Sequence, residues 1–202
     1  MQGRHCKFIP LAFLAMLSVG CSLDAVNPYL SLPDDKPVTR EFAGKQWDND
    51  KVDSPGEIAL TAQVTTVRLE KMSWGEIYRI TFKTKPQAAG EEIGAHYLLV
   101  TDNEILHLMS EDMDREIRVI REMKKQPKFE KGDVLALTKG RIRFDDGPWT
   151  TEVKIEGNTS SKMAWHNGAG HFSTYVWKKG AGLIEIASGR GADLSGYRLK
   201  AK

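Results

Sequence analysis

The stretch that decides the fold is Glu57 to Thr84, which reads EIALTAQVTTVRLEKMSWGEIYRITFKT. From Ile58 to Leu69, and again from Glu76 onward, apolar or β-branched residues alternate with polar ones. This period of two is typical of strands that bury one face. The interruption between them, Lys71 to Gly75, contains a glycine that favours a tight turn. The stretch therefore predicts two long antiparallel strands joined as a hairpin.

Short strands and turns continue toward the C-terminus. The segments 96–100 and 104–108 predict a second hairpin, because Thr101-Asp102-Asn103 between them favours a turn. Eleven of the 18 glycines follow residue 130, and they separate seven further alternating segments. These segments are Val134–Leu137, Arg141–Phe144, Trp149–Ile155, Lys162–Trp165, Phe172–Trp177, Leu183–Ala187 and Tyr197–Leu199. Such regular spacing indicates an antiparallel β-sandwich or a barrel-like domain.

One segment, Glu111–Lys125, has a helical pattern instead. Ser110 is a suitable N-cap, acidic residues fill the first turn, lysines fill the last turn and Pro127 follows. Apolar residues recur at helical spacing on one side of this segment. They are Met113, Ile117, Ile120 and Met123. The sequence thus predicts a mainly β fold with one amphipathic helix, at about residues 111–125, packed across the sheet.

The composition fits one globular domain with a tail. The chain has 202 residues, of which 41% are hydrophobic and 28% are charged. Its formal charge of +2 comes from Arg4 and Lys7, and residues 21–202 contain 27 basic and 27 acidic side chains. Proteins that bind nucleic acids rely on an excess of cations against phosphates. We therefore expect no nucleic-acid partner.

Residues 1–20 have the pattern of a secretory signal peptide. The first seven contain two cations and no acid, and Phe8–Val19 is apolar apart from Pro10 and Ser18. Twelve residues rise only about 18 Å as a helix, well short of the roughly 30 Å hydrocarbon core of a bilayer. This segment therefore predicts export and cleavage rather than a transmembrane helix.

The apolar run ends at Leu17-Ser18-Val19-Gly20-Cys21, which resembles the lipobox of bacterial lipoproteins. That family usually has Leu three residues before the cysteine, where this chain has Ser18. The resemblance implies cleavage before Cys21, lipidation of Cys21 and a membrane partner through this N-terminal lipid. Ser22 stands where an inner-membrane retention signal would have Asp, which implies the outer membrane, facing the periplasm. Cleavage by the ordinary secretory peptidase is the alternative interpretation.

The cysteine count agrees with lipidation. Cys6 lies within the predicted signal peptide, so Cys21 is the one cysteine of the mature chain and no disulfide can form within it. A lipid would block a thiol that is otherwise free in an oxidising compartment.

Residues 21–55 are rich in proline and aspartate and lack a long apolar pattern. We interpret them as a tether, with the β-rich domain occupying residues 56–202. Four apolar residues of this tether could dock onto the domain, and a first strand between Val38 and Trp47 is an open alternative. These residues are Tyr29, Leu30, Phe42 and Trp47.

His166 and His171 flank a four-residue segment, Asn167 to Gly170, that suits a hairpin loop. In such a hairpin the two imidazoles would oppose each other, at Cβ atoms about 5 Å apart, close enough to share a metal ion. A third ligand is missing from the local sequence. We therefore interpret the two residues as a structural or surface pair and expect no metal or other cofactor.

The strand Phe172–Trp177 offers two interpretations. Tyr175 and Trp177 share one face, whereas Phe172 and Val176 share the other. If the second face is buried, Tyr175 and Trp177 form an exposed patch that could bind a protein or a glycan. If the first face is buried, Tyr175 and Trp177 are core residues.

The sequence shows no nucleophile elbow, phosphate loop or calcium loop. It therefore predicts a lipid-anchored envelope protein that acts as a non-enzymatic binding or interaction module. One alternative is an envelope hydrolase acting on cell-wall or lipid material. Its best carboxylate pair, Glu152 and Glu156, would lie about 13 Å apart along one strand, which is too far. An inhibitor or immunity lipoprotein is the other alternative.

Overall fold

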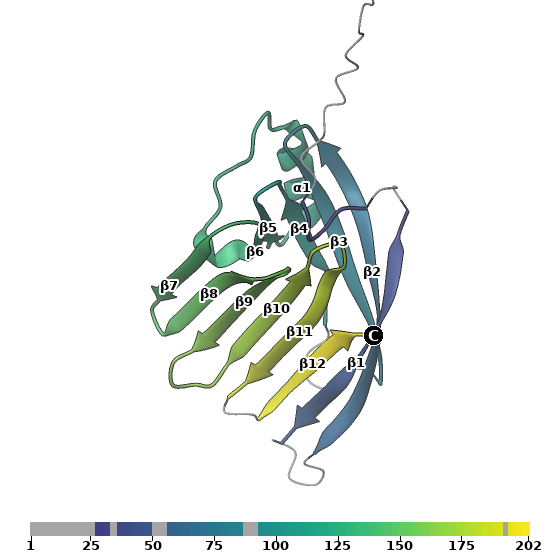
Figure 1. Ribbon diagram of the computed structural model, residues 1–202, viewed down its shortest axis with the longest axis vertical. Coiled ribbons are helices and arrows are strands. Elements are labelled where there is room, and N and C mark those ends of the chain that lie inside the picture. The colour runs from purple at the N-terminus through teal and green to yellow at the C-terminus, as the bar shows by residue number, and fades with distance from the viewer. Residues whose placement is uncertain (1–26, 33–35, 50–55, 87–92, 192–193) are drawn as a thin grey trace, which may run out of the picture.

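The structure is a computed structural model that describes residues 27–32, 36–49, 56–86, 93–191 and 194–202. Its twelve strands form one antiparallel sheet in the order β6-β5-β4-β3-β2-β1-β12-β11-β10-β9-β8-β7. The sheet curls around its own inner face into a nearly closed, barrel-like shape (Figure 1). The expected mainly β, antiparallel, barrel-like fold with a single helix is confirmed for the described residues.

The strands lie close to their predicted positions. Their bounds are β1 Val38–Asp48, β2 Glu57–Met72, β3 Gly75–Lys85, β4 His96–Val100, β5 Glu104–Leu108, β6 Val134–Leu137, β7 Arg141–Asp146, β8 Trp149–Glu156, β9 Thr159–His166, β10 Phe172–Lys178, β11 Gly182–Arg190 and β12 Ser195–Ala201. β2 and β3 pair antiparallel along almost their whole length, from Thr61 opposite Lys85 to Met72 opposite Gly75. The hairpin predicted from Glu57–Thr84 therefore forms, with its turn at Ser73 and Trp74.

The sheet begins earlier than the predicted domain boundary at residue 56. β1 lies between β2 and β12, with Phe42 paired to both Ala62 and Ala201. Residues 27–32 also pack onto the domain, because Tyr29, Leu30 and Leu32 are buried. The boundary was placed too late because Thr39, Glu41 and Lys45 give most of the outer face of β1 a polar character, which resembles a solvated tether. The described part of residues 21–55 thus belongs largely to the domain.

One edge of the sheet packs against strands near the other edge, which nearly closes the barrel. β6, at one edge, lies across β8 and β9 near the other edge. The backbone N–H of Leu137 on β6 donates a 2.9 Å hydrogen bond to Oγ of Ser160 on β9. Ser160 is fully buried, so this bond lies inside the closure rather than on its rim.

The helix α1, Met113–Glu122, is shorter than the predicted 111–125. Asp112 rather than Ser110 is its N-cap, and the Asp112 side chain accepts a hydrogen bond from the backbone N–H of Arg115. Ile117 and Ile120 are buried with Leu99, Leu106 and other residues of the sheet, as the apolar stripe predicted. In the part of the chain that the structure describes, no helix has the length and apolar character needed to cross a membrane.

Candidate functional site

An aromatic row crosses the outer face of the barrel. Trp165 on β9 pairs with Phe172 on β10, and Phe172 pairs in turn with Gly189 on β11. The Phe172 ring leans over this glycine, because a Cβ atom at Gly189 would lie only 2.3 Å from ring carbon Cε1. Because Gly189 has no side chain, the Phe172 ring can lie directly against the backbone of β11.

Trp47 on β1 continues the row from the other side. A Cβ atom at Gly196 on β12 would lie 2.6 Å from Cζ2 of Trp47, so the indole covers that glycine. Gly196 pairs with Gly189, the glycine beneath Phe172. Two neighbouring glycines thus make room for two rings that lean toward each other across β11 and β12. We refer to Trp47, Met163, Trp165 and Phe172 as the outer platform.

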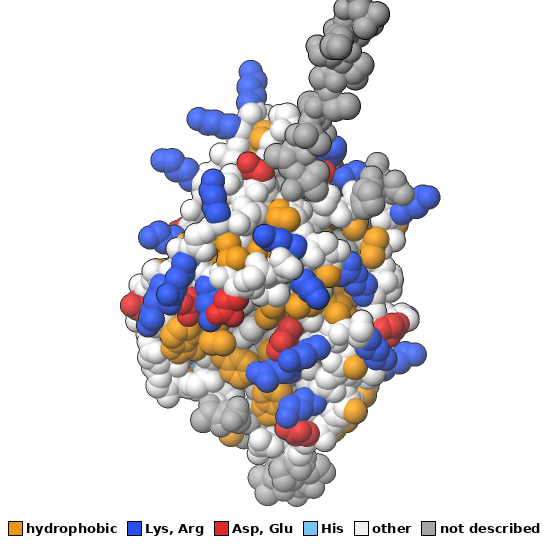
Figure 2. All heavy atoms as spheres, viewed as in Figure 1, with side chains coloured by type: hydrophobic (Ala, Val, Ile, Leu, Met, Phe, Trp, Pro, Cys, Tyr) orange, Lys and Arg blue, Asp and Glu red, His pale blue; other side chains and the backbone are white. Residues whose placement is uncertain are grey.

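The outer platform is open to solvent. Met163 shares the face of Trp165 on β9 and is 50% exposed, and the three aromatic residues are half-buried. Figure 2 shows hydrophobic side chains gathered in front of the strands that Figure 1 labels β8 to β11. Beside them, Arg198 and Lys200 on β12 both pair with Glu185 on β11, at 3.6 and 3.2 Å. The outer platform is therefore an apolar centre with a charged rim.

Tyr175 and Trp177, the predicted partner-binding residues, face the opposite way. Trp177 pairs with the fully buried Ser160 and is itself 1% exposed. Tyr175 pairs with the buried Lys162 and packs against the larger core cluster. Both residues therefore belong to the core, which was the second interpretation of this strand, and the predicted partner-binding role does not suit them. The alternating pattern alone could not decide which face of β10 is buried. On this strand, the aromatic residue on the outer face is Phe172.

His166 and His171 close the β9–β10 hairpin, since the His166 backbone N–H donates to the His171 carbonyl oxygen at 2.8 Å. Their rings lie 5.9 Å apart, edge to face, and both lie against Trp149. Each Nδ1 accepts a backbone hydrogen bond, from Ala169 and from Gly191. No group of three His, Cys, Asp or Glu residues suited to a metal ion occurs within the described ranges. The pair holds two loops in place.

Glu152 and Glu156, the carboxylates of the hydrolase alternative, are each engaged by a neighbouring cation. Glu152 pairs with Arg141 on β7, and Glu156 pairs with Lys154 on its own strand at 2.5 Å. This arrangement holds the two carboxylates on the sheet surface, apart from each other, and gives no geometry for acid–base catalysis between them.

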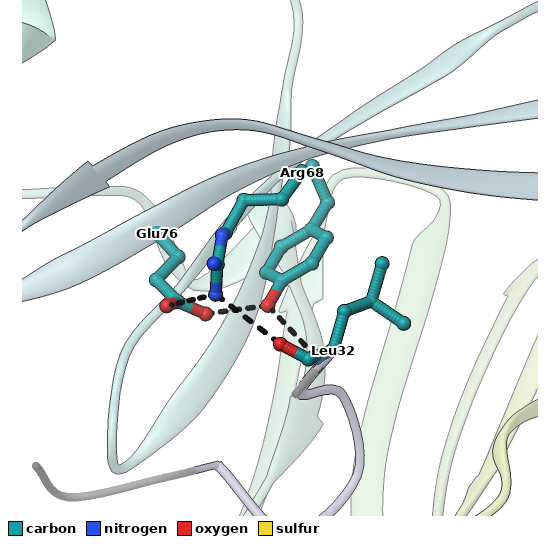
Figure 3. Close-up of polar contacts among 4 residues, drawn as sticks. Leu32, Arg68 and Glu76 are labelled. Carbon is teal, nitrogen blue, oxygen red and sulfur yellow. Dashed lines mark hydrogen bonds and ion pairs between the residues drawn. The ribbon is translucent and has the colours of Figure 1, made fainter. Parts of the chain in front are cut away.

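A second polar group holds residues 27–32, which we call the strap, onto the sheet (Figure 3). Arg68 on β2 donates to Glu76 on β3 at 2.9 Å and to the Leu32 carbonyl oxygen at 3.3 Å. Tyr78 donates to the other oxygen of Glu76 and accepts from the Leu32 backbone N–H at 3.3 Å. Burial, together with the hydrogen bond to Glu76, raises the pKa of Tyr78 to about 12. The strap is thus fixed by an ion pair and a tyrosine that stays neutral.

Replacing Glu76 by alanine should lower the free energy of unfolding by about 3 kcal/mol, because Arg68 would lose its carboxylate partner where its side chain is only 12% exposed. The matched control is Glu57→Ala, since Glu57 pairs with Lys45 at a site where both side chains are about half exposed. That variant should lose less than about 1 kcal/mol. Denaturant unfolding measures both. Equal losses would mean that the ion pair does not hold the strap.

Two histidines lie inside the barrel. His96 on β4 lies 5.2 Å from His107 on β5 and 5.9 Å from Tyr175 on β10, measured between ring centres. Burial, helped by the charge of His107, lowers the pKa of His96 to about 4. Burial and the charge of Lys162 also lower the pKa of His107. Lys162 donates a 2.5 Å hydrogen bond to the Gly132 carbonyl oxygen, and burial lowers its pKa.

The stability of the fold should therefore fall as the pH drops from about 6.5 to about 4. In that window an unfolded histidine binds a proton whereas folded His96 does not, so protonation favours the unfolded chain. The contribution is fully present above pH 6.5 and is lost toward pH 4. His96→Phe should flatten the dependence of unfolding free energy on pH relative to the wild type. A slope identical to that of the wild type would contradict this assignment.

The described residues form a single curled antiparallel sheet with one α-helix and an exposed aromatic row on the outer face. No family model, no curated protein and no solved structure matches the chain. Cys21, the predicted lipidation site, lies outside the described residues.

Proposed function

We propose that this protein is a lipid-anchored envelope protein that binds a protein partner through its outer platform. The observation that carries the proposal is the exposure of Met163 beside Trp165 and Phe172, on the face of the sheet that the core does not use. Contiguous apolar side chains on the outside of a soluble domain mark interaction sites. An inhibitor or immunity lipoprotein would be one form of this function, with an enzyme as the partner.

The chemistry of the outer platform favours a protein over a glycan. Tryptophan, phenylalanine, methionine and arginine are the residues enriched at protein–protein interfaces, where they form an apolar centre inside a polar rim. Here Arg198 and Lys200 share the single carboxylate of Glu185, so this part of the rim carries an excess of positive charge. We therefore expect the partner to present an apolar patch bordered by acidic side chains.

The anchor is proposed from the sequence around Cys21. The lipobox-like segment ends at this cysteine, and the strap begins at Asn27, six residues later. Three acyl chains exceed the two that stable membrane anchoring requires. We place the protein at the cell envelope, at the outer membrane facing the periplasm, because Ser22 follows the cysteine.

Site-specific photocrosslinking in native envelopes tests the function. A photoreactive amino acid at position 163 should give a discrete adduct with one partner protein. Position 58 is the matched control, because Ile58 is 54% exposed and lies outside the outer platform. An adduct at 163 and none at 58 supports the proposal. Equal patterns at both positions, or no adduct at 163, would overturn it.

A further inference from the structure

The strap marks the end of the barrel that lies nearest to the proposed anchor. Asn27 follows Cys21 by six residues, and an extended chain spans at most about 3.5 Å per residue, or about 20 Å in all. Asn27 is buried and donates a 2.7 Å hydrogen bond to the Thr101 carbonyl oxygen, so the start of the strap has a defined place on the domain. Whatever surrounds Asn27 is therefore held within about 20 Å of the lipidated residue.

Three loops meet the strap at this end. Asn27, Lys71, Trp74 and Gln126 line one open, polar cavity of about 770 Å³. Trp74, in the β2–β3 turn, donates a 2.9 Å hydrogen bond to the carbonyl oxygen of Met123, just after α1. The β10–β11 turn joins them, because the Gly180 backbone N–H donates to the Pro28 carbonyl oxygen at 2.8 Å.

These three loops and the strand ends beside them carry exposed lysines. The group, which we call the basic end, consists of Lys71, Lys124, Lys125, Lys178 and Lys179. Asp102 and Glu122 lie nearby and offset part of its charge. Figure 2 shows Lys and Arg side chains projecting from the upper end of the molecule, where Figure 1 places α1 and the β2–β3 turn.

The other end of the barrel carries charges of both signs. The loops there are tied together by hydrogen bonds from Asn49 to Leu194 and from Asn167 to Pro148. Four acidic residues occupy these loops and the adjoining strand ends. They are Asp48, Glu57, Asp145 and Asp146. Lys45, Lys85 and Arg190 lie at the same end, so its charges nearly balance. Beside the strap, Glu76 and Glu70 pair with Arg68 and Arg121, so the five lysines of the basic end outnumber the remaining acids Asp102 and Glu122.

We propose that the basic end docks onto an anionic phospholipid surface and fixes the orientation of the domain on the membrane. The inference rests on the proposed lipidation of Cys21, which confines the basic end close to the bilayer. Lysines attract anionic headgroups when they lie within about one Debye length, roughly 8–10 Å, of the surface. In this orientation the barrel stands on its basic end. The outer platform, on the side of the barrel, then stays accessible to a protein partner.

The test uses the full-length lipidated protein in vesicles of phosphatidylcholine with about one third phosphatidylglycerol and a quencher on the headgroups. A fluorophore is attached to Ser73→Cys, in the β2–β3 turn, or to Ile58→Cys, at the other end of β2. The sixteen residues of β2 separate these positions by up to about 50 Å. We expect quenching at position 73 to exceed that at position 58 by at least threefold. The difference should shrink on vesicles of phosphatidylcholine alone and at high salt.

A charge-reversed variant identifies the lysines responsible. Lys124→Glu with Lys125→Glu, combined with the label at position 73, should remove most of the excess quenching on anionic vesicles. Equal quenching at positions 73 and 58, or quenching that ignores lipid charge and these substitutions, would overturn the docking proposal. Failure of lipidation is a separate outcome, because the protein would then not float with vesicles of neutral composition.

Discussion

Cys21→Ala is expected to abolish labelling of the protein by a palmitate analogue and to release it from the membrane. The substitution removes the thiol that the lipobox resemblance assigns to the diacylglycerol group, and with it all three acyl chains. In the described residues nothing offers a membrane-spanning helix that could replace the lipid. Metabolic labelling followed by membrane flotation measures both effects.

Cys6→Ala is the matched control for this experiment. Cys6 lies within the predicted signal peptide, so its replacement should leave labelling and flotation as in the wild type. Equal labelling of the wild type and the Cys21 variant would contradict the lipoprotein assignment. Loss of labelling in the Cys6 variant would show that cleavage does not occur before Cys21.

Ile120→Asp is expected to unfold the domain or to lower its free energy of unfolding by about 5 kcal/mol. Ile120 lies on the face of α1 that packs against the sheet and is fully buried, in the cluster that contains Leu99, Leu106 and Val134. The aspartate would place an unpaired carboxylate in that cluster, and the typical stability of a domain is only 5–15 kcal/mol.

Val119→Asp is the matched control, because it introduces the same carboxylate at the neighbouring position on the exposed side of α1. Val119 is 44% exposed, so its replacement should cost less than about 1 kcal/mol. Chemical denaturation monitored by circular dichroism compares the two variants. If Ile120→Asp melts like Val119→Asp, α1 does not pack on the sheet and the single-sheet architecture is wrong.

Local pattern was enough to predict most of the strands. β4, β5 and β6 have the predicted bounds, because each is a short run of residues between clear turn signals. The helix was predicted three residues too long at its C-terminal end, at Lys125 instead of the observed Glu122. Met123 is already extended, and its carbonyl oxygen accepts the Trp74 indole N–H instead of continuing the helix.

Long-range pairing decided what local pattern could not. The sequence left a tether and a first strand between Val38 and Trp47 as alternatives, and the pairing of β1 with β2 and β12 decides for the strand. The faces of β10 were equally ambiguous, and only pairing with Ser160 and Lys162 turns Trp177 and Tyr175 inward. The outer platform depends on Gly189 and Gly196 being neighbours on β11 and β12. The sequence shows both glycines, but it does not show that they pair with each other.

The most direct test of the central claim is the yield of the crosslinked adduct from position 163 in native envelopes when Trp165 is replaced by alanine. Trp165 is half-buried on the outer face, so the variant should still fold and stay anchored. Since aromatic residues at an interface centre commonly contribute 2 kcal/mol or more, the adduct should fall at least tenfold. Val119→Ala, at an exposed apolar position on α1, should leave the yield unchanged. An undiminished adduct with Trp165→Ala would contradict binding through the outer platform.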